Sequence, residues 1–336
     1  FQHRNCRVWI FFCRSILAVW FWKCIFNAGL LDCLDAIFLQ TGFLENDASC
    51  CNTDVYVYTQ RSHFRACSAD NKRSNIWYWS HFRIIQKFKI RGHRLGMKKI
   101  ADIFGQWDET IIWSCLQGLM GEIYTNAPED DAVMAILGDF AFYAGKPSAK
   151  LLRFKPESCT QDFIIMVPQN DKWAGLIEKC YGKNAKKVSR YAIKKEKDIF
   201  DKCKLQQAVL QLPGGYELKL LEEDDYMLCQ KNRWANDLVS QFKSYNSYRK
   251  LGLGVVVLKD GELVAGASSY SRYNDGIEIE IDTREDHRRK GLAYACGAKL
   301  ILECLERGLY PSWDAQNMWS VALAEKLGYH YSTSSG

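Results

Sequence analysis

Apolar and acidic residues alternate strictly between Gly276 and Thr283, and this is the clearest pattern in the chain. A period of two is typical of a β-strand whose two faces differ. A basic turn follows at residues 288–290, and the run from Tyr294 to Arg307 has the length and apolar content of a helix. The sequence therefore predicts a strand, a loop and a helix, and the two strand faces carry Ile277, Ile279 and Ile281 on one side and Glu278, Glu280 and Asp282 on the other.

The surrounding residues extend this unit into a mixed sheet. Lys259-Asp260-Gly261-Glu262 and Asn274-Asp275-Gly276 are turn sequences of the kind that close hairpins. We expect residues 205–336 to form an α/β domain, in which an antiparallel meander of three strands leads into a parallel strand–helix–strand unit. The apolar runs predict strands at 217–221, 254–258, 263–271 and 309–315, and helices at 223–242 and 320–327.

A second α/β unit precedes this domain. Gly138-Asp139 is a tight-turn dipeptide, and Asn170 or Asp171 can cap a helix. A charged segment at 194–204 and the turn Pro213-Gly214-Gly215 mark the passage to the next domain. We therefore expect an N-terminal companion domain at 97–204, with helices at 107–118 and 171–181 and strands at 132–137, 140–144, 163–167 and 187–193.

The first 96 residues differ from the rest of the chain in composition. They contain no Met and no Pro, but 7 of the 14 Cys and 5 of the 11 Trp, and the first Met is Met97. We interpret residues 1–96 as translated sequence upstream of the true start, or as a disordered segment, and assign them no fold. The alternative is a membrane anchor at 8–26. Arg14 and Lys23 interrupt that apolar run, and each would cost about 3 kcal/mol at the centre of a spanning helix.

Charge and cysteine usage exclude several classes of function. The net charge of +6 divides into +7 for residues 1–96 and −1 for residues 97–336. The later part therefore gives no electrostatic reason to expect a nucleic-acid partner. No C-x-x-C motif occurs, and we expect no metal site. The scattered thiols, such as Cys296 and Cys304, fit the interior of a cytoplasmic protein.

Two motifs identify a family that the chain resembles. The first is the basic turn, whose spacing R-x-x-G-x-A is formed by Arg288, Gly291 and Ala293. Backbone N–H groups at such a helix start suit a diphosphate. The second motif, one strand later, comprises Asn317, Ser320 and the sequence E-K-x-G-aromatic at 325–329. In this order and spacing, the motifs resemble the acetyl-CoA-binding signatures of the GNAT superfamily of N-acetyltransferases.

The resemblance implies that acetyl-CoA binds along the strand, the loop and the second helix. In the superfamily, the pantetheine pairs with the strand before the loop, and the diphosphate lies at the loop itself. The resemblance implies neither a metal nor a covalent enzyme intermediate. The implied donor-binding residues are Ile281, Asp282, Thr283, Arg288, Arg289, Lys290, Gly291, Leu292, Ala293, Asn317 and Ser320.

The resemblance also implies that the acetyl group passes directly to a primary amine of a small molecule. Glu278 or Glu280 is the candidate base, because both lie on the acidic face of the strand, and His287 is a lesser candidate. Alternating glutamates on a strand can instead form a plain solvent face. Ala324 stands where the superfamily usually has a Tyr that reprotonates the departing thiolate. This departure raises an alternative function, that of a non-catalytic acyl-CoA-binding regulatory module. An acyltransferase anchored to a membrane through residues 8–26 is a third.

Residues 97–336 further resemble the GNAT branch that includes the zwittermicin-resistance acetyltransferases. The similarity rests on Gly138-Asp139-Phe140, the run 144–147, the run 266–270 and the run 311–314. For this branch we expect the N-terminal domain to shape the side of the site that takes the acceptor.

Overall fold

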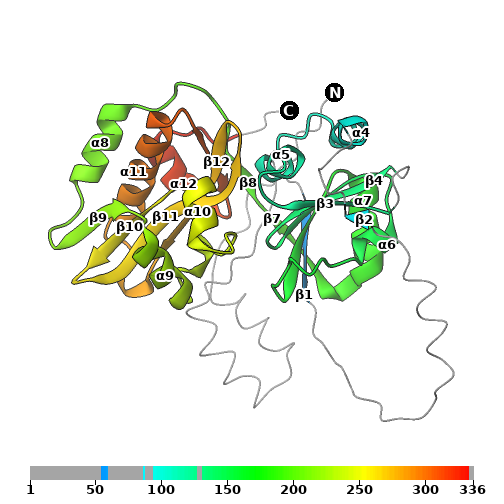
Figure 1. The fold of residues 1–336 in the computed structure, drawn as a ribbon, viewed down its shortest axis with the longest axis horizontal. Helices are drawn as coiled ribbons and strands as arrows, with labels where there is room; N and C mark the ends of the chain where they lie inside the picture. Colours follow the sequence, from blue (N-terminus) through cyan, green and yellow to red (C-terminus); the bar gives the residue numbers. More distant parts are fainter. Residues whose placement is uncertain (1–53, 60–85, 88–93, 127–130, 333–336) are drawn as a thin grey trace, which may run out of the picture.

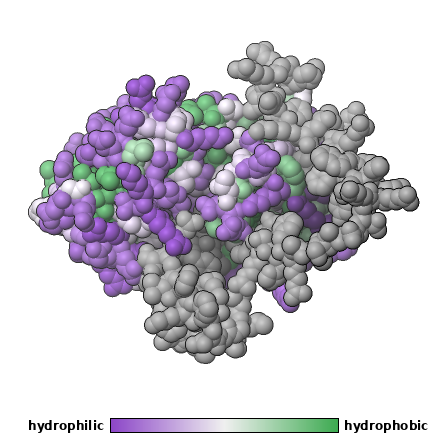
Figure 2. All heavy atoms as spheres, turned by 60° about the horizontal axis from the view of Figure 1, so that its bottom comes forward, coloured by the Kyte–Doolittle hydropathy of each residue, from purple (hydrophilic) through white to green (hydrophobic). Residues whose placement is uncertain are grey.

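The computed structural model describes residues 54–59, 86–87, 94–126 and 131–332. Within them the chain forms two larger β-sheets and a third sheet of two strands. Figure 1 shows the two larger sheets side by side, with helix α5 (Thr110–Gln117) at their junction. Hydrophilic residues cover most of the described surface on the face shown in Figure 2, and apolar residues form small areas among them.

The first sheet has seven strands in the order β2-β3-β4-β5-β6-β1-β7. Its strands β5 and β6 are parallel, and all other neighbours are antiparallel. Its strands are β1 (Asp54–Thr59), β2 (Gln86–Lys87), β3 (Glu122–Thr125), β4 (Ala132–Leu137), β5 (Phe140–Gly145), β6 (Phe163–Pro168) and β7 (Ala185–Ser189). Helices α4 (Arg94–Phe104), α6 (Ala149–Leu152) and α7 (Asp171–Tyr181) and the short helix η1 (Gly182–Asn184) accompany them.

Turn and cap residues fix the elements of this sheet. Gly138 closes the hairpin between β4 and β5 with a left-handed φ of 59°, a conformation that glycine adopts without steric cost. The side-chain oxygen of Asn170 accepts hydrogen bonds from the backbone of Lys172 and Trp173, and so caps α7. Trp173 is fully buried, and its indole donates to the carbonyl of Gly145 at 2.9 Å. These contacts hold α7 against the sheet.

The second sheet has the order β13-β12-β11-β10-β9. Strands β9 to β12 form the antiparallel meander, and β13 is parallel to β12. Helix α11 covers one face and α9 and α10 lie on the other, while α8 packs against α11 (Figure 1). The strands are β9 (Tyr216–Leu220), β10 (Gly254–Lys259), β11 (Glu262–Tyr273), β12 (Gly276–Thr283) and β13 (Tyr310–Ser312). The helices are α8 (Lys202–Leu210), α9 (Glu223–Lys231), η2 (Asn236–Leu238), α10 (Tyr245–Leu251), η3 (Glu285–His287), α11 (Leu292–Glu306) and α12 (Met318–Leu327).

The two faces of β12 have the predicted division. Ile277 is fully buried and packs in one core cluster with Leu292 and Cys296 of α11. Glu280 lies opposite Ser268 of β11, whereas Ile281 lies opposite Ala267, so the acidic residues point away from α11. They face η2 and α5, both of which contact β12. The glutamates are therefore half-buried between elements and do not form an open solvent face.

Strand β13 accompanies β12 only at its beginning. Parallel pairing joins residues 276–278 to residues 310–312. The next strand, β14 (Asp314–Ala315), pairs instead with β8 (Tyr191–Ala192). Within the described part of the chain, no strand pairs with this edge of β12 over residues 279–283. Such an edge offers backbone N–H and C=O groups to an extended ligand.

The α/β fold class predicted from the sequence is confirmed, whereas several elements differ from the prediction. The strand expected at 309–315 is divided into β13 and β14, which pair with different strands. The strand expected at 187–193 is divided at Arg190, whose buried guanidinium pairs with Asp314 of β14 at 2.9 Å. The helix expected at 223–242 ends at Lys231. The side chain of Asn232 donates to the carbonyl of Leu228 at 2.9 Å, and this local bond replaces the next helical turn.

Most of residues 1–96 lie outside the described residues, including the candidate anchor at 8–26. The described pieces are β1 and β2, which pair within the first sheet, and the start of α4, which begins at Arg94, upstream of Met97. The interpretation of residues 1–96 and the domain boundaries stay predictions. Among the residues that the structure describes, no helix combines the length and the apolar character needed to cross a membrane.

A buried polar contact joins the two larger sheets. The hydroxyl of Tyr270 in β11 donates to the Asp139 carboxylate at the β4–β5 turn, at 2.9 Å. The Tyr270 ring also meets Phe140 edge-on, with 5.9 Å between the ring centroids. Burial raises the pKa of Asp139 to about 6, although the bond from Tyr270 and the charge of Arg190 act in the opposite direction.

We expect this carboxylate to make stability depend on pH. Between its ordinary value of 3.8 and about 6, the folded protein holds a proton that the unfolded chain has released, so the free energy of unfolding falls as pH rises. A shift of about two units corresponds to about 3 kcal/mol. The side chain in Asp139→Asn cannot ionise, so the variant lacks this pH dependence. The free energy of unfolding of wild type minus that of the variant should therefore fall by up to about 3 kcal/mol between pH 4 and pH 7. Urea titrations at several pH values measure this difference. A difference that does not change with pH would contradict the buried, protonated Asp139.

Candidate active site

The loop between β12 and α11 has the geometry of an anion site. Gly291 forms the N-cap of α11 with a left-handed φ of 82°, and Arg289 also has a positive φ, 59°. A side-chain carbon at Gly291 would meet no other atom within 4 Å, so the space beside the loop is open. The first backbone N–H groups of a helix have no acceptor within the helix. The loop therefore offers these donors to a ligand that approaches through open space.

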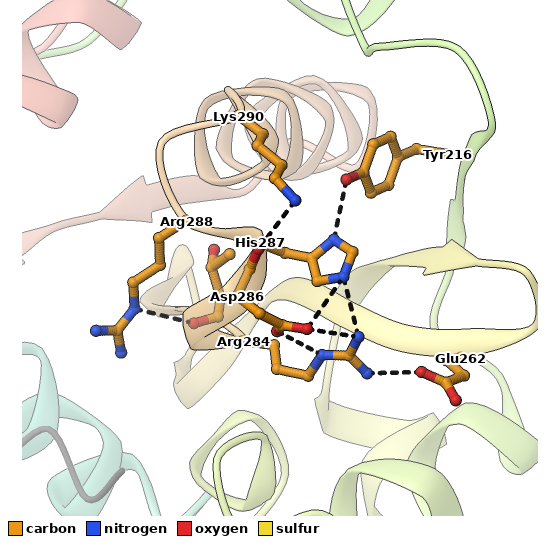
Figure 3. Close-up of polar contacts among 8 residues, drawn as sticks. Tyr216, Glu262, Arg284, Asp286, His287, Arg288 and Lys290 are labelled. Carbon is orange, nitrogen blue, oxygen red and sulfur yellow. Dashed lines mark hydrogen bonds and ion pairs between the residues drawn. The ribbon is translucent and has the colours of Figure 1, made fainter. Parts of the chain in front are cut away.

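A network of charged side chains holds the loop in place (Figure 3). Arg284 donates to Glu262 and to Asp286, both at 2.8 Å. Lys290 donates to the carbonyl of Asp286 at 2.9 Å, and Arg288 donates to the carbonyl of Thr283 at 3.3 Å. Two of the three basic residues predicted to bind the donor thus hydrogen-bond to backbone carbonyls near their own loop.

The third basic residue, Arg289, lies against α12. Its guanidinium carbon is 5.2 Å from the centroid of the Trp319 ring, a cation–π contact. Trp319 is 70 % exposed. Arg289 therefore connects the loop before α11 to the first turn of α12.

His287 belongs to the same network and lies beyond the opposite end of β12 from Glu278. Its Nε2 accepts a hydrogen bond from Arg284 at 2.9 Å, and its Nδ1 lies 2.9 Å from the Tyr216 hydroxyl. Partial burial and the charge of Lys290 lower the pKa of His287. Both ring nitrogens are occupied, and the geometry therefore does not favour His287 as the base.

The unpaired edge of β12 leads directly into the loop. Residues 281–283 lie on it, and the Thr283 side-chain oxygen is buried without a hydrogen-bond partner among the described residues. A buried hydroxyl without a hydrogen-bond partner costs free energy unless a ligand or a water molecule supplies that partner. The residues of this strand and loop thus fit a donor that carries both amides and a diphosphate.

The second motif has a structural role in addition to its predicted one. The side-chain oxygen of Asn317 accepts hydrogen bonds from the backbone of Trp319 and Ser320, both at 3.0 Å, and so caps α12. The Ser320 hydroxyl lies 3.1 Å from the indole nitrogen of Trp313, which donates to it. Whether these two residues also touch the donor stays a prediction.

No hydroxyl stands at the usual position of the thiolate's proton donor. Ala324 is fully buried in α12. Tyr329 is also buried, and its hydroxyl donates to the carbonyl of Pro311 at 2.6 Å. Tyr329 is therefore committed to the core and does not replace the missing Tyr.

The two candidate bases have different surroundings. The Glu278 carboxylate accepts a hydrogen bond of 2.6 Å from the hydroxyl of Thr110, the first residue of α5. Glu280 lies one period further along β12, where burial, followed by repulsion from Asp282 and Asp237, raises its pKa well above the usual range. This shift favours the neutral form of Glu280 more than that of an ordinary carboxylate.

Other potential nucleophiles are buried or hydrogen-bonded. Burial raises the pKa of the Cys296 thiol, which is fully enclosed, and a thiol rather than a thiolate is a poor nucleophile. The buried Ser268 hydroxyl lies 2.8 Å from that of Tyr248, with which it hydrogen-bonds. Neither residue has the surroundings of a covalent catalyst.

Sequence reasoning missed three residues of this site. Thr110 starts a helix in the other domain, and nothing nearby in the sequence connects it with Glu278. Asp237 lies in η2, which was expected to be part of a long helix. Trp319 follows Asn317 by two positions, and its place in the second motif could have drawn attention to it.

Comparisons with known proteins agree with this geometry. Residues 101–334 match the family described as GNAT acetyltransferase. A GCN5-related N-acetyltransferase-like protein from Streptococcus suis 89/1591 is 46% identical, with a TM-score of 0.68 over 72% of this chain and 96% of that one. An uncharacterized N-acetyltransferase, YdfB from Bacillus subtilis (strain 168), is 29% identical over 169 residues.

The match to YdfB covers 49% of this chain and 62% of that protein, so it spans less than two thirds of the relative. The family match covers the second sheet and the first sheet except for β1 and β2, and includes β12, the Gly291 loop and α12. These comparisons do not confirm the resemblance to the zwittermicin-resistance branch. They agree with the architecture, and the chain belongs to the GNAT acetyltransferase family.

Proposed function

We propose that this protein transfers an acetyl group from acetyl-CoA to a primary amine of a small molecule by direct attack in a ternary complex. The observation that carries the proposal is the organisation of β12. This one strand has a carboxylate at the point where β13 stops, an unpaired edge beyond it, and an anion-binding loop at its end. The candidate base, the backbone edge for the donor and the diphosphate site thus follow one another along β12.

The donor supplies a thioester, and the chain supplies the groups that hold and polarise it. Backbone N–H groups at residues 291–293 bind the diphosphate at the N-terminus of α11. The open backbone edge of residues 281–283 pairs with the amides of the pantetheine arm. A backbone N–H on this edge polarises the thioester carbonyl, because a fixed donor is most effective where negative charge develops.

Glu278 is the better candidate for the base. A hydrogen bond from a hydroxyl stabilises the charged form of a carboxylate, and Thr110 provides one. The raised pKa of Glu280 lowers the fraction of this carboxylate that is ionised and able to accept the proton of an ammonium group. The amine, once deprotonated by Glu278, forms the new C–N bond as the C–S bond breaks. With Ala324 at the usual acid position, water protonates the thiolate.

The test is the release of coenzyme A thiol from acetyl-CoA in the presence of polyamines, aminoglycosides and simple primary amines. An enzyme releases thiol with at least one amine at a rate that depends on amine concentration. The second candidate function is a regulatory acyl-CoA-binding module, which is favoured by the buried Ala324 at the position of the usual proton donor. Saturable binding of acetyl-CoA without thiol release across the panel would establish the module and refute the transferase.

Thr110 should matter for catalysis although it belongs to the companion domain. Thr110→Val keeps the shape of the side chain and removes the donor to Glu278. We expect kcat to fall about tenfold, equal to about 1.4 kcal/mol, with the KM for acetyl-CoA unchanged. The acid limb of the pH profile should move to higher pH, because a carboxylate that loses a donor is protonated more easily.

Thr110→Ser is the matched control, since it keeps the hydroxyl. It should restore most of the rate and the original pH profile. An equal loss of activity in both variants, with no movement of the acid limb, would assign Thr110 to packing alone.

The branch assignment is part of the proposal and has its own support. Asp139 and Tyr270 come from two of the runs that carry the resemblance to the zwittermicin-resistance acetyltransferases, and they contact each other between the sheets. This contact brings the companion domain to β11, and the bond from Thr110 to Glu278 brings it to the acidic face of β12, where we place the acceptor amine.

A further inference from the structure

Trp319 is an exposed aromatic side chain at the edge of the proposed donor site. It is 70 % exposed, and its neighbour Met318 is 51 % exposed. Both lie in the first turn of α12, directly after the cap residue Asn317. A large aromatic side chain left in water forgoes the free energy of burial. A ligand that covers it would recover part of that free energy.

The position of Trp319 relative to the loop is fixed by Arg289. The guanidinium carbon lies 5.2 Å from the indole centroid, and the Arg289 backbone has a left-handed φ of 59°. That conformation is uncommon for a residue other than glycine, and the cation–π contact favours it. The indole is therefore held beside the N–H groups that would bind the diphosphate, and most of its surface remains open to solvent.

We propose that Trp319, held by Arg289, is a stacking platform for the adenine ring of the acyl-CoA donor. This inference rests on the proposed donor site, because it starts from a diphosphate at the Gly291 loop. In coenzyme A only a ribose separates the diphosphate from the adenine, so a planar base lies close to whatever flanks the diphosphate. Aromatic side chains stack on any base through its π face.

The surroundings favour a base over a protein partner. Stable protein interfaces involve about 20–30 residues on each side, whereas the exposed apolar surface here consists of Met318 and Trp319. Arg289 adds a positive charge at the same place, and this charge suits a nucleotide that carries phosphates. A single exposed indole beside a cation is a common means of binding a nucleobase.

The test compares two donors, one with and one without the adenine ring. S-acetyl-4′-phosphopantetheine lacks the whole 3′-phosphoadenosine and keeps one of the two phosphates of the diphosphate, so each variant is compared with wild type for the same donor. Calorimetry on the full chain measures both affinities, with the shorter donor titrated to millimolar concentration. We expect Trp319→Ala to lower the affinity for acetyl-CoA about tenfold and to leave the affinity for the shorter donor unchanged. Trp319→Phe keeps an aromatic face and should stay within about threefold of wild type for both donors.

Met227→Ala is the matched control, because Met227 is also exposed, at 44 %, but lies in α9, on the other face of the sheet from α11. It should bind both donors as the wild type does. Equal affinity of Trp319→Ala and wild type for acetyl-CoA would overturn the platform, and so would an equal loss for both donors. A wild-type protein that binds no acetyl-CoA at all would instead refute the proposed function, and the two failures are therefore distinguishable.

Discussion

Glu278→Gln should lower kcat/KM at pH 7 by about 100-fold, since a positioned base typically contributes 10²- to 10⁴-fold. The amide keeps the size of the carboxylate, and its oxygen can still accept the hydrogen bond from Thr110. It cannot accept a proton from the acceptor ammonium. Part of the activity should return at high pH, where the amine loses its proton to water. Steady-state rates of thiol release between pH 6 and pH 10 measure both effects.

Glu280→Gln is the matched control on the same face of the strand. Because burial and nearby carboxylates raise the pKa of Glu280 and so favour its neutral form, replacing it with a neutral amide should change kcat/KM by less than tenfold. A large loss in Glu280→Gln together with little effect in Glu278→Gln would exchange the two assignments. Full activity in both variants, with a flat pH response, would place the base elsewhere and make His287 the next residue to test.

Gly291→Asp should weaken the binding of acetyl-CoA by well over tenfold. The backbone at this position has a φ of 82°, which costs about 1–2 kcal/mol for a residue with a side chain. The carboxylate would also stand where we place the diphosphate, and two like charges at close range repel strongly. We expect the dissociation constant from calorimetry to rise by well over tenfold.

Gly308→Asp provides the control for this experiment. Gly308 has a φ of 65°, and a side chain there would also meet no atom within 4 Å, but it follows the far end of α11. The variant carries the same new charge and a similar backbone strain away from the loop. Acetyl-CoA should bind it as tightly as it binds wild type. Unchanged affinity in a folded Gly291→Asp would remove the loop from the donor site.

The second sheet could be predicted in detail because its signals are local. The alternation of Ile and Glu along β12 specifies a strand and its faces, and the Gly291 turn specifies the start of α11. The hairpin turns at 259–262 and 274–276 determine the antiparallel order. Where the prediction was wrong, a single side chain decided the outcome, as Asn232 does at the end of α9.

The contacts between the two domains could not be predicted in the same way. Thr110 and Glu278 are separated by 168 positions, and Tyr270 and Asp139 by 131. No periodicity relates residues so far apart, and only the folded arrangement brings them together. The sequence therefore indicated two equivalent glutamates on one strand face. The packing of α5 and η2 distinguishes them, because Glu278 accepts a hydrogen bond and the pKa of Glu280 is raised by burial and neighbouring carboxylates.

The most direct measurement is a crystal structure of the full chain with bound acetyl-CoA. The account predicts the diphosphate at the backbone of residues 291–293, the pantetheine arm along residues 281–283, and the thioester within reach of the acidic face at Glu278. Density for the donor at any other place, or a donor whose thioester lies on the α11 side of the sheet, would contradict it.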